Sequence, residues 1–375
     1  MSALDNHEYI APESLLRVFQ IDPYEDARWE ALVNAHPDAL IYHHPAWLRV
    51  LEEAFGYKPF HLGCEDARGQ LRGILPLFAT HGLFTGYMYS SLPRTPIGGT
   101  LALDDNAQSL LLQAAIQHTS KNAGAQLQIK VQTDELPEAV VDELVGGPWR
   151  ETYVVDLPER PDPLHIGNTR SHTHHIRWAI HQAEQQGIEV QLAETEQELR
   201  AWYQVYLETM RKVCVPPRPY RFFQIAWHHL KARGLLWLLV AKRSQGGHSQ
   251  IVAGTLYLLF GQTIFCAYNG RSLGDTSLHS NDAIHWRAIH DAYAGGFRYY
   301  DLGEVSKGNT GLATFKSKWG AEVRLLYRYY CPTPREVAIN VLESSTPIHR
   351  LGNWIWQKLP LNATVLLSTW GHHWF

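Results

Sequence analysis

The segment from Gly295 to Tyr330 places the tightest limits on how this chain can fold. Gly295-Gly296 should end a preceding helix, because glycine is the residue most often found just beyond a helix C-terminus. The aromatic residues 297–300 favour a short buried strand, and a polar, glycine-containing loop should follow from Glu304. A short helix and a last strand are expected over 311–330. This order predicts an α/β unit with charged groups at the C-terminal end of a strand, where such sheets usually bind ligands.

The same order of predicted elements occurs twice along the chain. Each half should run strand, helix, Pro-rich break, helix, meander of strands, helix and strand, although sequence identity between the halves is poor. The prolines in residues 158–163 mark the boundary between them. The chain of 375 residues also exceeds the length at which one core stops growing, about 250–300 residues. We therefore expect an α/β fold with mixed α+β sheets, two tandem domains over 1–160 and 161–332, and a helical, Trp-rich extension over 333–375.

Composition and charge exclude several classes of protein. The net charge of −4 with neutral histidine gives no global basic field, so any RNA contact must come from local patches. The four cysteines are scattered without paired spacing, which predicts neither a disulfide framework nor a zinc site. The N-terminus lacks the apolar segment of a signal peptide, so we expect a cytoplasmic protein.

Two segments raise the question of membrane contact. Residues 244–270 carry no Asp, Glu, Lys or Arg and are long enough to span a bilayer, but Gly261-Gln262 interrupts them between two β-rich runs. A hairpin of two buried strands is therefore the favoured interpretation. The C-terminal extension is rich in tryptophan, and either packs across the protein surface or lies at the inner face of a membrane. Its tryptophans are Trp354, Trp356, Trp370 and Trp374.

The segment that begins at Tyr300 resembles a known family. Tyr300-Asp301-Leu302-Gly303, a Gly-containing loop and then Phe315-Lys316-x-Lys318-Trp319-Gly320-Ala321 are similar to the C-terminal signature of the Fem-type, FemAB-like aminoacyltransferases. The resemblance covers roughly 15–332 in element order and implies two tandem GNAT-type acyltransferase domains. It also implies transfer of an aminoacyl group from aminoacyl-tRNA to an amine of a cell-envelope precursor, peptidoglycan-like or polysaccharide-linked. No metal or redox cofactor is implied, and the oligomeric state is left open.

The resemblance assigns the chemistry to the second domain. An amine that attacks an ester or thioester builds negative charge on the carbonyl oxygen, and a fixed cation beside that oxygen lowers the barrier. The lysine of the family's Phe-Lys pair assists catalysis, and it matches Lys316, which we expect at the open end of the sheet facing a cleft. Asp301 is the second catalytic candidate, since it can orient Lys316, cap the following loop or accept the proton of the amine. The alternative is that Lys316 and Lys318 form a solvated helix face.

Other segments supply candidate substrate-binding residues. A Pro/Gly turn around residues 94–99 resembles the family's turn beside the acceptor site, and a basic, aromatic stretch over 211–221 suits bases or phosphates. The predicted helix over 168–186 carries histidines where the family often has Arg or Lys, and no acid or cysteine close enough to suggest a metal. The candidates are Phe315, Lys318, Glu304, Arg94, Thr95, Gly98, Arg177, Arg211, Arg218 and Tyr268.

Two further functions remain open. An acyl-CoA-dependent GNAT N-acyltransferase acting on an amino sugar or small amine would cradle pyrophosphate on a Gly-rich loop before the helix over 280–294. Residues 269–277 contain two glycines and one arginine without the spaced Arg/Gln-x-x-Gly-x-Gly/Ala pattern, which disfavours that donor. From another class, the chain could be a non-catalytic carbohydrate- or tRNA-binding protein that retains the fold.

Overall fold

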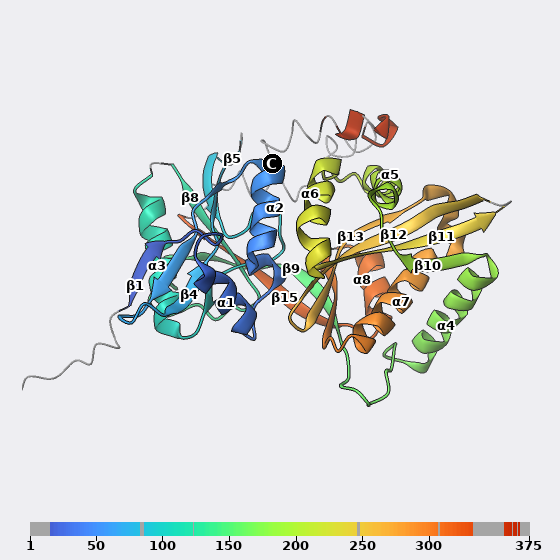
Figure 1. Cartoon of the computed structure of the whole chain (residues 1–375), viewed down its shortest axis with the longest axis horizontal. Helices are drawn as coiled ribbons and strands as arrows, with labels where there is room; N and C mark the ends of the chain where they lie inside the picture. Colours follow the sequence, from blue (N-terminus) through green and yellow to red (C-terminus); the bar gives the residue numbers. More distant parts are fainter. Residues whose placement is uncertain are drawn as a thin grey trace, which may run out of the picture.

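The structure is a computed structural model, and it describes residues 16–82, 86–122, 124–245, 248–306, 308–332, 356–361, 363–365 and 367. Figure 1 shows the two halves of the chain side by side, with central strands running between them. The first half begins with a strand, which is followed by two α-helices and then by further strands. Its elements are β1 (Arg17–Gln20), α1 (Ala27–Ala35), η2 (Ile41–His43), α2 (Pro45–Phe55), β2 (Lys58–Pro59), β3 (Leu62–Glu65), β4 (Leu71–Leu75), β5 (Phe78–Gly82), β6 (Gly86–Ser90), β7 (Leu101–Ala102), α3 (Asp105–Ser120), β8 (Gln126–Val131) and β9 (Val145–Asp156).

The second half repeats the plan with longer strands. Its elements are α4 (Arg170–Gln185), β10 (Ile188–Leu192), α5 (Glu196–Lys212), α6 (Tyr220–Leu230), η3 (Lys231–Arg233), β11 (Leu236–Gln245), β12 (His248–Phe260), β13 (Thr263–Arg271), η4 (Leu273–Leu278), α7 (Ser280–Ala294), β14 (Tyr299–Val305), α8 (Thr310–Ser317) and β15 (Glu322–Cys331). The uncharged run is the antiparallel pair β12 and β13, which confirms the predicted hairpin. No described helix is long and apolar enough to cross a membrane.

Strands of the two halves are exchanged in one continuous sheet. Within the described residues this sheet has eleven strands in the order β10-β11-β12-β13-β14-β9-β15-β8-β6-β5-β2, and a second sheet has the order β1-β3-β4-β7. The last strand, β15, lies between β8 and β9 of the first half, and β9 lies between β15 and β14 of the second. Each half therefore depends on a strand of the other. The boundary at residue 160 stays a prediction, since the sheet runs across it.

Each half contains one parallel pair of strands that soon part. β13 and β14 pair over three residues, ending at Phe265 opposite Asp301. β6 and β8 pair over three residues in the same way, ending at Ser90 opposite Gln128. Beyond these points β14 continues along β9, and β8 continues along β15. Main-chain groups at such a divergence lack a neighbouring strand and must find other partners.

The large sheet of the second half separates two layers of helices. Leu238 and Val240 of β11 face the core formed with α5 and α6, whereas Leu239 and Ala241 face the core formed with α4 and α7. This alternation follows from the two-residue period of a strand. The α5–α6 core continues into the first half, where Phe55 of α2 stacks on Phe222 of α6 at 5.4 Å.

Three elements differ from the sequence-based expectation. The sequence Asp22-Pro23 is a typical helix start, but helix α1 begins after the N-cap Asp26, because that side chain accepts from Arg28 N. A strand was predicted over 152–157, whereas strand β9 begins at Val145. Strand β14 continues to Val305 through the residues expected to open a loop, because Glu304 pairs with Thr152 of β9 beyond a bulge.

The C-terminal extension is described only in part. Leu361 and Val365 pack against the core shared by the halves, and Arg211 Nη1 donates to Leu359 O at 3.3 Å. The described part of the extension thus packs on the protein. The predicted helix near 335–344 and three of the four tryptophans lie outside the described residues. Membrane contact stays a prediction.

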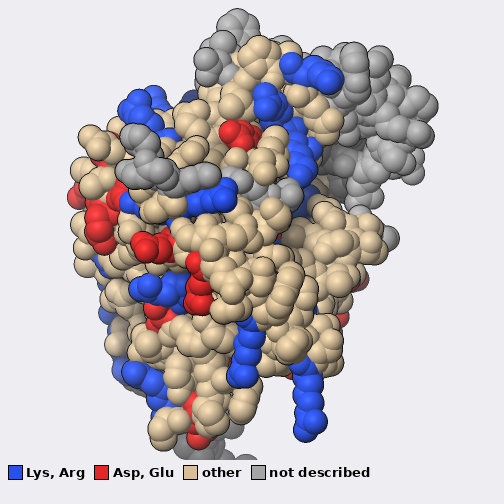
Figure 2. Space-filling view, turned by 90° about the vertical axis from the view of Figure 1, so that its right-hand side faces the viewer, with Lys and Arg blue, Asp and Glu red and all other residues tan. Residues whose placement is uncertain are grey.

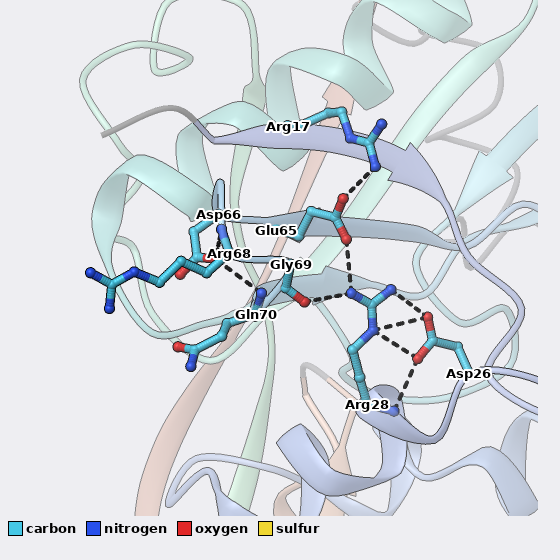
Figure 3. Close-up of polar contacts among 8 residues, drawn as sticks. All are labelled: Arg17, Asp26, Arg28, Glu65, Asp66, Arg68, Gly69 and Gln70. Atoms are coloured by element: carbon cyan, nitrogen blue, oxygen red, sulfur yellow. Dashed lines mark hydrogen bonds and ion pairs between the residues drawn. The ribbon is translucent and has the colours of Figure 1, made fainter. Parts of the chain in front are cut away.

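Ion pairs and hydrogen bonds connect the first elements of the first half in one cluster (Figure 3). Glu65 of β3 accepts from Arg17 of β1 and, at 2.8 Å, from Arg28 of α1. Arg28 also donates to Gly69 O at 2.6 Å and pairs with Asp26. Hydrogen bonds from Arg17 and Arg28 lower the pKa of Glu65. The cluster therefore links two strands, β1 and β3, with one turn and the first helix.

We expect Arg28→Met to lower the free energy of unfolding by about 1–2 kcal/mol at pH 7, because it removes charge-assisted hydrogen bonds to partly exposed partners. A carboxyl with a depressed pKa stabilises the fold above its unfolded pKa and loses this effect as the pH falls. Urea unfolding should therefore show a difference that shrinks below about pH 4, with the exposed Lys121→Met as control. Equal stability at pH 7 would contradict this role.

Candidate active site

Lys316 lies at the divergence of β13 and β14. Its ammonium donates to Gly303 O at 2.8 Å and to Glu304 O at 3.0 Å. The residue is 6% exposed, so it does not belong to a solvated helix face, which was the alternative in the sequence analysis. That it faces a cleft stays a prediction. An ammonium has three N–H donors, and no described residue accepts the third. Burial lowers the pKa of Lys316, and Asp301 and Glu304 oppose this effect.

Asp301 shapes the bulge that Lys316 holds. Its Oδ1 accepts from Thr152 Oγ1 at 2.6 Å and from Gly303 N at 2.7 Å. Gly303 has φ +81°, and a side chain there would lie 3.1 Å from Cys266 O and 3.9 Å from Lys316 Nζ. Glycine is therefore required by both conformation and space. Burial raises the pKa of Asp301, which is 6% exposed.

Glu304 presents an unused carboxylate oxygen beside this bulge. Its Oε1 pairs with Arg150 of β9, whereas Oε2 is buried and has no hydrogen-bond partner among the described residues. Trp149 Nε1 and Arg328 Nε are also buried and have no hydrogen-bond partner among the described residues. The Arg328 guanidinium lies 3.5 Å from the Trp149 ring centroid. Buried polar atoms are normally paired, so these atoms need partners from water or from a ligand.

The loop at the other strand divergence presents Arg94. Leu92 and Arg94 both have left-handed backbone conformations, with φ of 59° and 64°. Lys130 of β8 is buried, and its ammonium donates to Leu92 O at 2.9 Å and Thr95 O at 3.1 Å. Thr95 Oγ1 bonds back to Leu92 O and Ile97 O. Strained residues persist where their surroundings fix them, and they cluster at functional sites.

Residues from both halves meet at Arg94. Its Nε donates to Tyr57 OH at 2.5 Å, and Arg218 Nη2 donates to Arg94 O at 3.1 Å. The Arg94 and Arg218 guanidinium carbons lie 5.1 and 5.7 Å from the Phe55 ring centroid. Burial raises the pKa of Tyr268 on β13, and the charge of Arg218 opposes this shift. We call Arg94, Arg218, Tyr268 and Glu304, together with Lys316, the junction cluster.

Other predicted site residues have different surroundings. Thr95 and Gly98 shape the Arg94 loop, and Gly98 N bonds to Lys130 O at 3.2 Å. Lys318 forms an ion pair with Asp282 of α7 and lies 4.4 Å from the Phe315 ring centroid, so both serve packing of α8. Arg211 contacts the C-terminal extension. Arg177 is exposed on α4, in a separate hollow.

Several residues at the junction were not predicted from the sequence. Lys130, Tyr57 and Arg150 supply the contacts that orient Arg94 and Glu304. A lysine between the apolar Ile129 and Val131 of β8 is the one local signal, because a charged residue in a buried strand usually has a specific partner. Tyr57 and Arg150 carry no such signal.

Comparison with known proteins shows which families and structures this chain resembles. Residues 170–317 match the family model described as "Acetyltransferase (GNAT) domain". No match was found among the curated proteins. FemX is similar in structure, with 13% identity and a TM-score of 0.62 over 87% of this chain and 99% of that chain. L-PGS from Bacillus licheniformis has 15% identity and a TM-score of 0.54, covering 85% and 98% of the two chains. A tandem GNAT protein from the clavulanic acid biosynthesis pathway has 12% identity and a TM-score of 0.53, covering 86% and 100%.

These findings identify the protein class. Residues 170–317 form a domain of the GNAT acyltransferase family. The whole chain has the tandem GNAT fold of FemX, so the Fem-type resemblance is confirmed at the level of the fold.

Proposed function

We propose that this acyltransferase moves an aminoacyl group from aminoacyl-tRNA to an amine of a cell-envelope precursor, peptidoglycan-like or polysaccharide-linked. The observation that carries the proposal is the buried Lys316 ammonium, whose third N–H has no acceptor among the described residues, at a strand divergence of a FemX-like fold. The Glu304 carboxylate, whose charge opposes the lowering of the Lys316 pKa, offers an oxygen without a described partner in the same region. A base and a cation are what acyl transfer to an amine requires.

The reaction assigns one role to each charged group. The amine attacks the ester carbon, a C–N bond forms, and the C–O bond to the ribose breaks. Glu304 Oε2 binds the incoming ammonium and accepts its proton, which matters most for an ε-amine with a pKa near ~10.4. The third N–H of Lys316 donates to the carbonyl oxygen as negative charge develops. The nitrogen loses its second proton after attack, and the departing ribose oxygen takes it up, while Glu304 later releases the first proton to solvent. Asp301 positions the Gly303–Glu304 bulge.

The two arginines of the junction cluster suit an anionic part of the acceptor. Arg94 and Arg218 come from different halves and are held by main-chain and aromatic contacts. Guanidinium groups bind phosphate and carboxylate through paired N–H donors. Envelope precursors carry such groups, so the arginines would orient the acceptor with its amine towards Glu304.

Acyl-CoA is the alternative donor, because the matching family model describes acetyltransferases. The start of α7, where a GNAT fold would hold the pyrophosphate, instead carries Asp282 in its first turn. Asp282 is 8% exposed and paired with Lys318. Its carboxylate satisfies the positive end of the helix and would repel a phosphate, which favours aminoacyl-tRNA.

A donor assay tests this proposal. The purified chain would be mixed with an amine pool and either radiolabelled aminoacyl-tRNA or radiolabelled acetyl-CoA. We expect label to move to the amine from aminoacyl-tRNA alone. Transfer from acetyl-CoA alone would assign the alternative donor. Transfer from neither would favour a non-catalytic carbohydrate- or tRNA-binding protein.

We expect Glu304→Gln to lower kcat/KM for the amine by about 100-fold, because the amide can still accept from Arg150 but cannot take a proton. Initial rates over a range of amine concentrations would measure this. Glu322→Gln, which removes an equal charge from an exposed position on β15, should leave the rate unchanged. A Glu304 variant within threefold of the native rate would rule out the proton-accepting role.

We expect Lys130→Met to raise KM for the anionic acceptor roughly tenfold with little change in kcat. The reason is that the Arg94 loop loses the two hydrogen bonds from the Lys130 ammonium to Leu92 O and Thr95 O. Steady-state kinetics would separate the two constants, and Lys121→Met serves as the surface control. A lower kcat at unchanged KM would show that Lys130 acts on the chemistry and not through Arg94.

A further inference from the structure

A hollow of about 490 Å³ lies between α4 and α7, on the second half of the chain. The residues that line it include His165, Arg170, His174, Arg177, Trp286 and His290, and no Asp or Glu is among the described residues that do so. Its volume falls in the range of small-ligand sites, roughly 300–1,000 Å³. The hollow is therefore large enough for a nucleotide-sized group and carries positive charge without a counter-charge.

The α4 side of the hollow is built from one face of that helix. Arg170, His174 and Arg177 are spaced by four and three residues, which puts them on the same face. No described residue forms an ion pair or a hydrogen bond with either arginine side chain, and both arginines are exposed. Guanidinium groups match the geometry of phosphate and carboxylate, so two arginines that line the same hollow favour an anionic ligand.

The α7 side adds an aromatic platform and a second donor position. The Trp286 and His290 rings lie 4.3 Å apart, and His290 Nδ1 donates to Trp286 O at 2.8 Å. This bond leaves His290 Nε2 without a partner among the described residues. Indole rings stack on flat groups such as nucleobases. Cationic side chains on one wall and a ring on the other are the groups that recognise a nucleotide.

We propose that this hollow binds a phosphate group of a nucleotide or polynucleotide, with Arg170 and Arg177 as its main contacts. Figure 2 views the side of the molecule on which α4 lies, where basic side chains project from a largely uncharged lower surface. The N-terminal turn of α4 contains no acidic residue, so the helix dipole adds to the positive field.

The hollow between α4 and α7 is distinct from the junction cluster. Helices α4 and α7 cover one face of the large sheet, whereas Arg218 and Tyr268 lie on the face covered by α5 and α6. Binding at the hollow therefore does not require the transfer reaction. A chain that transfers no acyl group would still bind phosphate here, so the two proposals can fail separately.

Fluorescence anisotropy with a labelled RNA hairpin, at several salt concentrations, tests the site. The Arg170→Gln/Arg177→Gln double variant should bind roughly tenfold more weakly, and the slope of log affinity against log salt should fall by about 2. Arg170→Lys/Arg177→Lys should retain most of the binding. Arg200→Gln removes one charge from α5 on the opposite face and should change neither value. Thermal melting would verify that all variants are folded.

Competition with AMP and with inorganic phosphate distinguishes the two sources of phosphate. Displacement of the RNA by millimolar AMP from the native chain, but not from the double variant, would assign a free nucleotide. Loss of RNA affinity in the double variant without such displacement would assign the polynucleotide backbone. Equal affinity, salt slope and displacement for the native chain and the double variant would overturn the proposal.

Discussion

Lys316→Met should lower the single-turnover rate of acyl transfer by about 100- to 1,000-fold, the usual cost of removing one donor to a developing oxyanion. Methionine fills the space of the buried lysine stem, so the substitution removes charge more than volume. The carbonyls of Gly303 and Glu304 lose their shared donor, which costs roughly 1–3 kcal/mol and is partly offset because no ammonium is buried.

The pH dependence separates a catalytic ammonium from a structural one. Burial lowers the pKa of Lys316, so the side chain loses its proton at a lower pH than an exposed lysine. The native rate should fall as the pH rises through that lowered pKa, and the methionine variant should lack this alkaline limb.

The control for Lys316 is Lys242→Met on β11, which breaks the 2.8 Å ion pair with Glu198 of α5. It should lower the melting temperature without changing turnover per folded molecule. If the two variants lose stability and activity in the same proportion, Lys316 only supports the fold.

The exchanged strands should prevent either half of the chain from folding alone. Residues 1–160 produced alone should not form a cooperatively folded monomer, because β15 is missing from its place between β8 and β9. The open edge of β8 would expose unpaired main-chain groups, and strand edges of this kind promote aggregation. Size-exclusion chromatography and the dispersion of an NMR spectrum would report the state of the fragment.

Co-expression of 1–160 with 161–375 provides the control for this prediction. The second fragment supplies β15 to the first and receives β9 from it, so the pair should assemble into one soluble species. A sharp, cooperative unfolding transition of the isolated 1–160 fragment would contradict the dependence of each half on the other.

The elements of the fold were largely predictable because their periodicity and end signals are local. The hairpin of β12 and β13 and helix α7 appear close to their predicted bounds. Strand β14 was predicted too short, since Gly303 and Glu304 are typical of loops. The strand continues past the bulge because Glu304 pairs with Thr152 and Val305 with Glu151, about 150 residues away. The place of β15 between two strands of the first half has the same long-range origin.

The candidate site was predictable in its residue types more than in its contacts. Arg94 and Arg218 do contact each other, but the sequence predicts neither the bond of Arg94 to Tyr57 nor the ion pair of Glu304 with Arg150. Lys316 was expected to face a cleft. Its ammonium is buried because it donates to the main-chain carbonyls of Gly303 and Glu304. These carbonyls lack a strand partner on that side because the pairing of β14 with β13 ends at Asp301.

The most direct test of the account is a crystal structure with an aminoacyl amide analogue of the 3′-terminal adenosine of tRNA. The account predicts the acyl carbonyl oxygen at about 3 Å from Lys316 Nζ and the carbonyl carbon open to an amine beside Glu304 Oε2. An analogue bound with its carbonyl away from the divergence of β13 and β14 would contradict it.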